Sequence, residues 1–160
     1  MSKNPYELRV RDVMSRDLVA ISNKATLHDC LQRMIDHNLA TLPVVTDANE
    51  CVGIVSATDM LHVTREVEED LHDLNHGDLT ASGWLLKRLT NGIDDRTVAD
   101  VMTEDVAMVG PDTRLSRAAT EMLRNRVHHL PVIDVREHVV GIISMSDVVS
   151  AFVDGDPHTE

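Results

Sequence analysis

The chain contains an internal repeat. Sliding the sequence by 88 positions places residues 10–61 on residues 98–149 without a gap. Fifteen of the 52 aligned positions are identical, and a glycine, a proline and several aspartates stay in register. The phrase GIVSATD at 53–59 becomes GIISMSD at 141–147. A repeat of this kind indicates that one supersecondary unit occurs twice and packs against its own copy.

Each copy predicts the same order of elements, a short helical turn followed by β-α-β-β-α. Apolar residues at i, i+3, i+4, i+7 and i+8 predict a helix from Leu27 to Ile35 and from Leu115 to Leu123. A two-stranded hairpin follows, and a final helix follows the Ser-x-x-Asp. The helical turns are predicted at Val10–Met14 and Val98–Met102, and the first strands at Leu18–Ile21 and Val106–Val109. The hairpin strands are predicted at Leu42–Thr46, Cys51–Ser56, Leu130–Asp134 and His138–Ser144.

One such unit buries too little surface to be stable alone. We therefore expect a mixed α/β fold of the α+β kind, with two β-α-β-β-α units packed in pseudo-twofold symmetry. The expected divisions are 10–61 for the first unit, 62–97 for a helical insertion, 98–153 for the second unit and 154–160 for a disordered tail. Paired units of this kind create paired clefts between them.

Composition excludes several classes of partner. The formal net charge is −12, which argues against nucleic acid, because a phosphate polymer needs a basic surface. Two cysteines make no disulfide framework, and neither a signal peptide nor a stretch of 18 apolar residues is visible. These features predict a soluble cytoplasmic protein with no membrane partner.

The repeated phrase allows two interpretations. In a capping box, the serine oxygen accepts a first-turn N–H and the aspartate three residues later reaches back. A helix N-terminus with adjacent hydroxyls also suits phosphate, and a carboxylate suits the diol of a ribose. The two roles are compatible. The glycines, Gly53 and Gly141, are typical of positions where two backbones approach closely.

The order of motifs resembles a tandem pair of CBS domains, a Bateman module. The resemblance rests on LPVV or LPVI, then VGI, then S-x-[ST]-D, with VMS or VMT opening each copy. It implies clefts that bind adenine nucleotides. Asp59 and Asp147 would hold ribose. Ser56, Thr58, Ser144 and Ser146 would lie near phosphate. Adenine would lie among the first-strand segments Leu18–Ala20 and Val106–Met108, which include Val19, together with Ile54 and Ile142.

The two copies differ just before LPV. His128 and His129 stand where the first copy has Ala40 and Thr41. In nucleotide-sensing members of the family, a similar stretch supplies a histidine and an arginine to phosphates. We therefore expect unequal sites, with the cleft of Asp147 better suited to a phosphorylated ligand and binding tightest at slightly acid pH. An exposed histidine pair at an ordinary strand start is the alternative.

Residues 62–97 have no counterpart in the repeat. Met60, Val63, Val67, Leu71 and Leu74 extend the preceding helix, and a second helix is predicted at Thr80–Leu89 around Trp84. The segment could pack on the module or contact a partner protein. His72 and His76 have the spacing of a metal pair, but an acidic, solvated helix face is the simpler interpretation, and we predict no metal.

The sequence shows no nucleophile with its base and no phosphate-binding glycine loop, so we do not expect an enzyme or a required cofactor. The favoured hypothesis is a regulatory sensor that binds AMP, ADP, ATP, NAD or S-adenosylmethionine, forms a homodimer and acts on an unidentified protein. The alternative is a structural dimerisation module without a functional nucleotide site.

Overall fold

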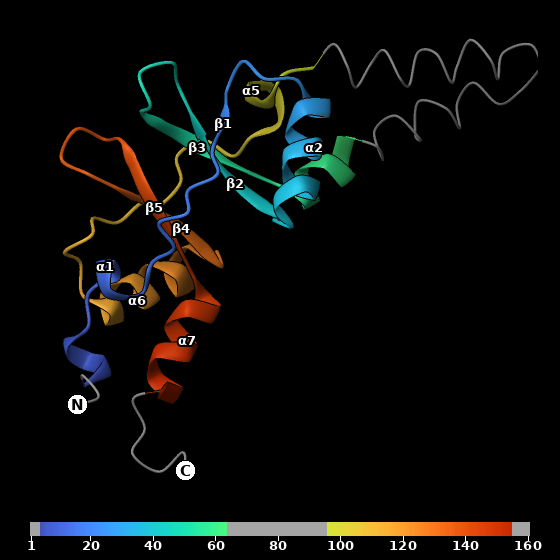
Figure 1. Ribbon diagram of the computed structural model, residues 1–160. Helices are drawn as coiled ribbons and strands as arrows, with labels where there is room; N and C mark the ends of the chain where they lie inside the picture. The colour runs from blue at the N-terminus through green and yellow to red at the C-terminus, as the bar shows by residue number, and fades with distance from the viewer. Residues whose placement is uncertain (1–3, 64–95, 155–160) are drawn as a thin grey trace, which may run out of the picture.

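The computed structural model describes residues 4–63 and 96–154 of the chain (Figure 1). In the first half, η1 (Pro5–Glu7), α1 (Val10–Val13), β1 (Ile21–Ser22), α2 (Leu27–His37), β2 (Thr41–Val45) and β3 (Cys51–Ser56) lead into a helix at 57–63. In the second half come α5 (Val98–Val101), α6 (Leu115–Asn125), β4 (His129–Ile133), β5 (Val139–Ser144) and α7 (Met145–Asp154). The predicted α+β architecture of two like units is confirmed.

The hairpins are the best-predicted elements. β2 pairs antiparallel with β3, and β4 pairs antiparallel with β5, in the same register and with an irregularity at the same place. Asn49 and Glu137 occupy equivalent turn positions with φ of 63° and 64°. The final helices begin directly after Ser56 and Ser144, so each aspartate of the Ser-x-x-Asp lies in the first turn rather than before the helix.

The predicted first strands are wrong in extent. Only Ile21–Ser22 forms β1, parallel to β2, and the counterpart at Val106–Val109 is reduced to a single bridge between Val109 and Val132. The residues before these points do not pair in the sheet of their own unit. Each segment starts at a bridge with the opposite unit, at Ser15 or Thr103, and then crosses between the two units. They reach the sheet of their own unit only at the end of the segment.

The crossing exchanges the first helical turn between the two halves of the chain. Ser15 and Ile142 exchange backbone hydrogen bonds of 2.9 and 3.1 Å, and Thr103 and Ile54 form the equivalent pair with the same two lengths. In Figure 1, α1 therefore lies beside α6 and α7, whereas α5 lies beside β1 and α2. Each lobe of the molecule combines the first turn of one repeat with the sheet and helices of the other.

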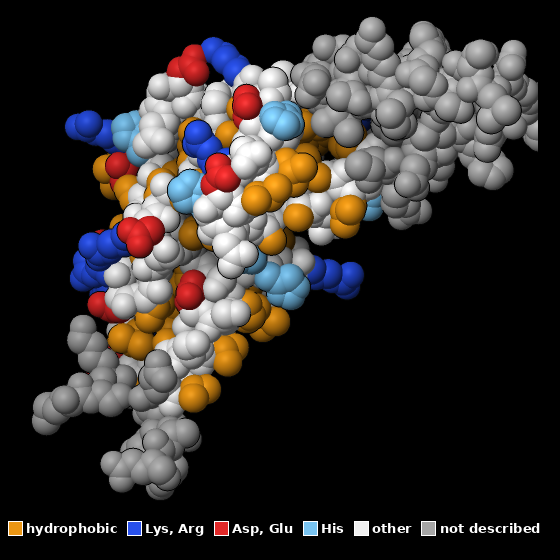
Figure 2. Space-filling model, turned by 45° about the vertical axis from the view of Figure 1, so that its right-hand side comes forward, with side chains coloured by type: hydrophobic (Ala, Val, Ile, Leu, Met, Phe, Trp, Pro, Cys, Tyr) orange, Lys and Arg blue, Asp and Glu red, His pale blue; other side chains and the backbone are white. Residues whose placement is uncertain are grey.

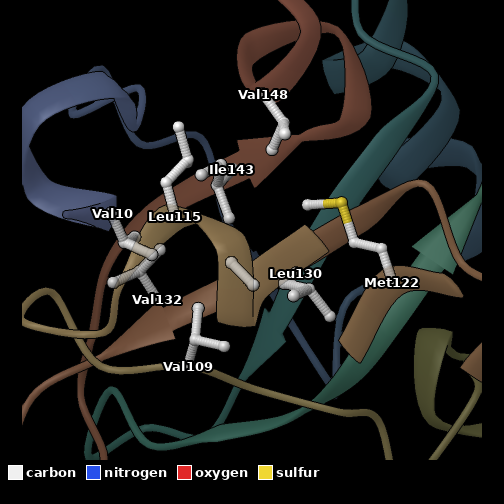
Figure 3. Packing of buried hydrophobic residues seen from close by; sticks show 9 residues of the cluster. Val10, Val109, Leu115, Met122, Leu130, Val132, Ile143 and Val148 are labelled. Carbon is white, nitrogen blue, oxygen red and sulfur yellow. The ribbon is translucent and has the colours of Figure 1, made fainter. Parts of the chain in front are cut away.

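The two hydrophobic cores show the same exchange. Val10 of α1 is fully buried in the cluster of the second repeat, and it lies beside Leu115 and Val132 in Figure 3. Val98 of α5 is fully buried with Cys30, Met34 and other residues of the first repeat. Full burial of a valine side chain stabilises a fold by roughly 1.5–3 kcal/mol. Each core therefore depends on a residue from the other half of the chain.

The glycine of the repeated phrase is required by this crossing. A Cβ at Gly141 would lie 2.7 Å from the carbonyl oxygen of Ser15, and a Cβ at Gly53 would lie 2.6 Å from that of Thr103. Both neighbours are backbone atoms held in the bridge, so neither gives way without moving the crossing strand. Close backbone approach, one of the interpretations of these glycines, is confirmed.

The second predicted helix of the insertion and most of the first lie outside the described residues, as do His72, His76 and 155–160. The divisions at 10–61, 62–97, 98–153 and 154–160 stay predictions.

We expect Gly53→Ala and Gly141→Ala each to lower the free energy of unfolding by about 1–3 kcal/mol, because the added methyl group overpacks against a backbone carbonyl. Gly110→Ala is the matched control, since its nearest neighbours would lie at 3.8 and 3.9 Å. Urea denaturation of the three variants measures the difference. Equal losses in all three would contradict the close-approach explanation.

Candidate ligand cleft between the two repeats

A cleft of about 240 Å³ lies between the two repeats. The first repeat lines it with Ser15, Asp17, Val19, Leu39, Ala40, Thr41 and Pro43. The second repeat lines it with His129, Ile142, Ser144 and Asp147. Larger hollows of about 640 and 440 Å³ follow the outer sides of α6 and α2, but each is formed largely by the exposed side chains of one helix. The interrepeat cleft, in contrast, gathers residues that are far apart in sequence.

The cleft is lined by a pair of residues that the pseudo-twofold symmetry of the repeats relates to each other. Thr41 and His129 are equivalent positions at the starts of β2 and β4, and both line this one cleft. The difference between the copies at this position therefore places a hydroxyl and an imidazole in one site. The crossing segment at 15–19 supplies a further wall.

The capping box is formed in both copies. The Ser144 N–H donates to Asp147 Oδ2 at 2.7 Å, and the Asp147 N–H donates to Ser144 Oγ at 3.1 Å. Ser56 and Asp59 make the same pair of bonds at 2.6 and 3.3 Å, and the Ser56 hydroxyl also donates to Asp59 Oδ2 at 2.8 Å. Both carboxylates are thus fixed by their own helix N-terminus.

Capping leaves one carboxylate oxygen of Asp147 for other chemistry. Oδ2 is used by the cap, while Oδ1 accepts no hydrogen bond from residues 4–63 or 96–154. An ionised carboxylate oxygen accepts two hydrogen bonds. Because the cap holds the side chain in one orientation beside the cleft, Asp147 is preorganised as an acceptor for hydroxyl groups.

His129, which pairs with Ser144 in the β4–β5 hairpin, is the histidine that lines the cleft. Its burial lowers the pKa of the imidazole below the ordinary 6.5, the neighbouring His128 lowers it further, and Asp147 acts in the opposite direction. The imidazole is therefore neutral at neutral pH, where it offers one donor and one acceptor rather than a positive charge. The His128 side chain is exposed and does not line the cleft.

The structure brings together only part of the predicted set. Asp147, Ser144, His129, Ile142 and Val19 line the cleft. Ser146 and Thr58 are exposed on their helices. Asp59 lines a different cavity of about 280 Å³ between the 57–63 helix and α5, and that cavity is not lined by Ser56, Thr58, Ile54, Val106 or Met108. The roles of all these residues as ligand contacts stay predictions.

Sequence reasoning missed Asp17, the acidic residue of the crossing segment, and also Ser15 and Leu39, which lies just after α2. One signal was available, because Asp17 and Asp105 are identical between the copies. The sequence pattern does not show the crossing, which places Asp17 in the same cleft as Asp147 rather than in the cavity of Asp59.

Other kinds of site are not formed by the described residues. Residues 4–63 and 96–154 hold no group of three or more His, Cys, Asp or Glu side chains placed for a metal ion. In the same ranges, no helix has both the length and the apolar character needed to cross a bilayer. Cys30 and Cys51 are both free thiols, and burial raises the pKa of Cys30 to about 11.

The fold defines a tandem-repeat module with a cleft between its two copies. The family model of the CBS domain matches residues 10–66 and 98–154, and the chain belongs to this family. The predicted resemblance to a CBS domain pair is confirmed.

Three relatives illustrate the range of the match. The chain is 28% identical over 138 residues to the gamma-3 subunit of 5′-AMP-activated protein kinase from Bos taurus, covering 86% of this chain and 24% of that subunit. It is 26% identical over 154 residues to an uncharacterized protein of Methanocaldococcus jannaschii, covering 90% of each. It matches the structure of Arabidopsis thaliana CBSX2 in complex with AMP with a TM-score of 0.69 and 26% identity, covering 91% of this chain and 96% of that one. The chain spans about a quarter of the kinase subunits that it matches.

We expect the stability of the protein to fall as the pH drops below about 6.5, because the folded state holds the pKa of His129 below that of the unfolded chain. Protonation then favours the unfolded state, and the full stability is present above this pH. His129→Gln removes the contribution. The thermal unfolding midpoint should therefore drop less between pH 7.5 and pH 5.5 in the variant than in the wild type, whereas parallel curves would contradict the assignment.

Proposed function

We propose that the chain is a regulatory module that binds an adenosine-containing ligand in the interrepeat cleft and passes the binding event to a partner protein. The single observation that carries the proposal is the composition of the cleft, whose walls come from both repeats. An occupant touches both lobes and stabilises the arrangement of the lobes that fits it. Ligand binding then shifts a population of lobe arrangements, which a partner can read.

The chemistry of the walls supports an adenosine moiety. Asp147 Oδ1 is fixed as an acceptor for the ribose hydroxyls. Val19, Pro43 and Ile142 supply apolar surface for a flat base, and the backbone of the crossing segment lies beside them. The CBSX2 structure contains AMP, and the kinase subunit is named for its AMP-activated enzyme. CBS domain pairs are regulatory modules rather than catalytic domains.

Asp147→Ala tests the ribose contact, and Asp59→Ala is its matched control. Both substitutions remove the same capping box, which costs about 0.5–2 kcal/mol of stability, but only Asp147 lines the cleft. Because hydrogen bonds to a charged group contribute about 1.5–3 kcal/mol, we expect Asp147→Ala to weaken binding of adenosine compounds about tenfold or more. Calorimetry measures both variants.

Equal affinities in the two variants would remove the ribose assignment. Absence of binding by the folded wild type to adenosine, AMP, ADP, ATP, NAD and S-adenosylmethionine would favour the alternative function, a dimerisation module without a nucleotide site.

An apolar face on the helices supports assembly into a homodimer. Leu31 and Ile35 of α2 and Leu61 of the 57–63 helix are 45%, 64% and 63% exposed. The second repeat presents Leu123, Val149 and Val153 at 72%, 54% and 51%. Figure 2 shows hydrophobic side chains along this side of the molecule. Because both repeats carry the face in equivalent places, a twofold axis can bring it against the same face of a second copy.

We expect the wild-type protein to have the mass of a dimer in light scattering after gel filtration, and Ile35→Glu to have the mass of a monomer, because a buried unpaired carboxylate opposes association. Val135→Glu is the control, since Val135 is fully exposed at a hairpin turn away from the helices. A monomeric wild type would contradict the dimer.

A further inference from the structure

The charge of the interrepeat cleft is negative. Asp17 and Asp147 both line it, and none of the residues that line it is lysine or arginine. No ion pair within residues 4–63 and 96–154 involves either carboxylate. Asp17 is exposed at the cleft and also accepts no hydrogen bond within these ranges. Its charge therefore acts on whatever occupies the space beside it.

Several N–H groups at the start of α7, beside the cleft, already have partners within the protein. The first N–H groups of α7 are the usual donors to a phosphate at such a position. Here the Ser144 N–H donates to the Asp147 carboxylate, the Met145 N–H donates to the His128 carbonyl at 2.8 Å, and the Asp147 N–H donates to the Ser144 hydroxyl. The Asp147 carboxylate thus places a negative charge at the positive end of the helix, beside the cleft.

The remaining polar groups suit a neutral ligand. His129 faces the cleft as a neutral imidazole at neutral pH, and Ser15, Thr41 and Ser144 offer hydroxyl groups. Hydroxyls and a neutral imidazole bind uncharged polar groups without a counterion. The sequence alone favoured a phosphorylated ligand here, and the geometry of these groups favours a different one.

We propose that this cleft selects an adenosine-containing ligand whose 5′ substituent is uncharged or cationic, and that it discriminates against a 5′-phosphate. The inference rests on the proposed function, since it concerns the 5′ end of the adenosine that the cleft would hold. The ribose binds Asp147, and the 5′ substituent lies in the field of Asp17. A dianionic phosphate is repelled by both carboxylates, whereas an ammonium or sulfonium group is attracted by them.

The test compares three ligands that share adenosine and differ in charge at the 5′ position: 5′-amino-5′-deoxyadenosine, adenosine and AMP. Calorimetry on the full chain at neutral pH should show AMP binding about tenfold or more weaker than adenosine, with the amine at least as tight as adenosine. High salt should reduce the difference in affinity between adenosine and AMP, because the screening length falls from about 10 Å at 0.1 M to about 3 Å at 1 M.

Asp17→Asn isolates the charge, because the amide keeps the size of the side chain. We expect it to narrow the ratio of adenosine affinity to AMP affinity several-fold. Asp105→Asn is the matched control, since Asp105 is the equivalent residue of the second repeat and does not line the cleft. Asparagine also tolerates the left-handed conformation of Asp105, whose φ is 52°.

The outcomes distinguish a failure of this inference from a failure of the proposed function on which it rests. Binding of AMP as tight as or tighter than adenosine would overturn the charge selectivity and leave the adenosine cleft intact. An unchanged affinity ratio in Asp17→Asn would remove Asp17 from the explanation and overturn the inference as stated. Binding of none of the three ligands by the folded protein would refute the proposed function itself.

Discussion

The short antiparallel bridge between the crossing segment and the last strand of the opposite repeat is the contact on which the structure depends. It occurs twice, as Ser15 with Ile142 and Thr103 with Ile54, and each occurrence lies against a glycine that has no room for a side chain. The bridge fixes where the chain crosses between lobes. It thereby delivers Val10 and Val98 to cores built mainly by the other repeat.

The same bridge forms the site. A chain segment held against β5 at Ser15 must pass the N-terminus of α7 on its way to β1, so Asp17 and Val19 become one wall of the cleft and Asp147 becomes the other. The two repeats carry different residues at one equivalent position, Thr41 and His129, and these residues set the polarity of the remaining walls. The two repeats are alike in backbone but unlike in what they present to this space, which explains how a symmetric fold carries an asymmetric site.

Much of the fold followed from local pattern. The apolar spacing of α2 and α6 is helical and long, and the hairpins are bounded by turns, so their existence and type were predictable. The short capping phrase was also interpretable, because capping is a contact between residues three apart. The first strands failed because apolar residues at 18–20 and 106–108 look like a strand, yet they serve a crossing between lobes. The separation of Asp59 and Asp147 into unlike cavities could not be predicted, since it depends on contacts between residues more than 30 positions apart in the chain.

The exchange of α1 and α5 has a consequence for how such a molecule can exist at all. A single repeat could fill its core only by exchanging its first helical turn with that of a second copy. One repeat is therefore half of a pair. Joining the two halves in one polypeptide makes that association intramolecular, where the effective concentration of each half for the other reaches the millimolar range or above when the connection is flexible and spans the distance. Covalent fusion then frees the sequences to diverge, because the pairing no longer requires the two halves to be identical.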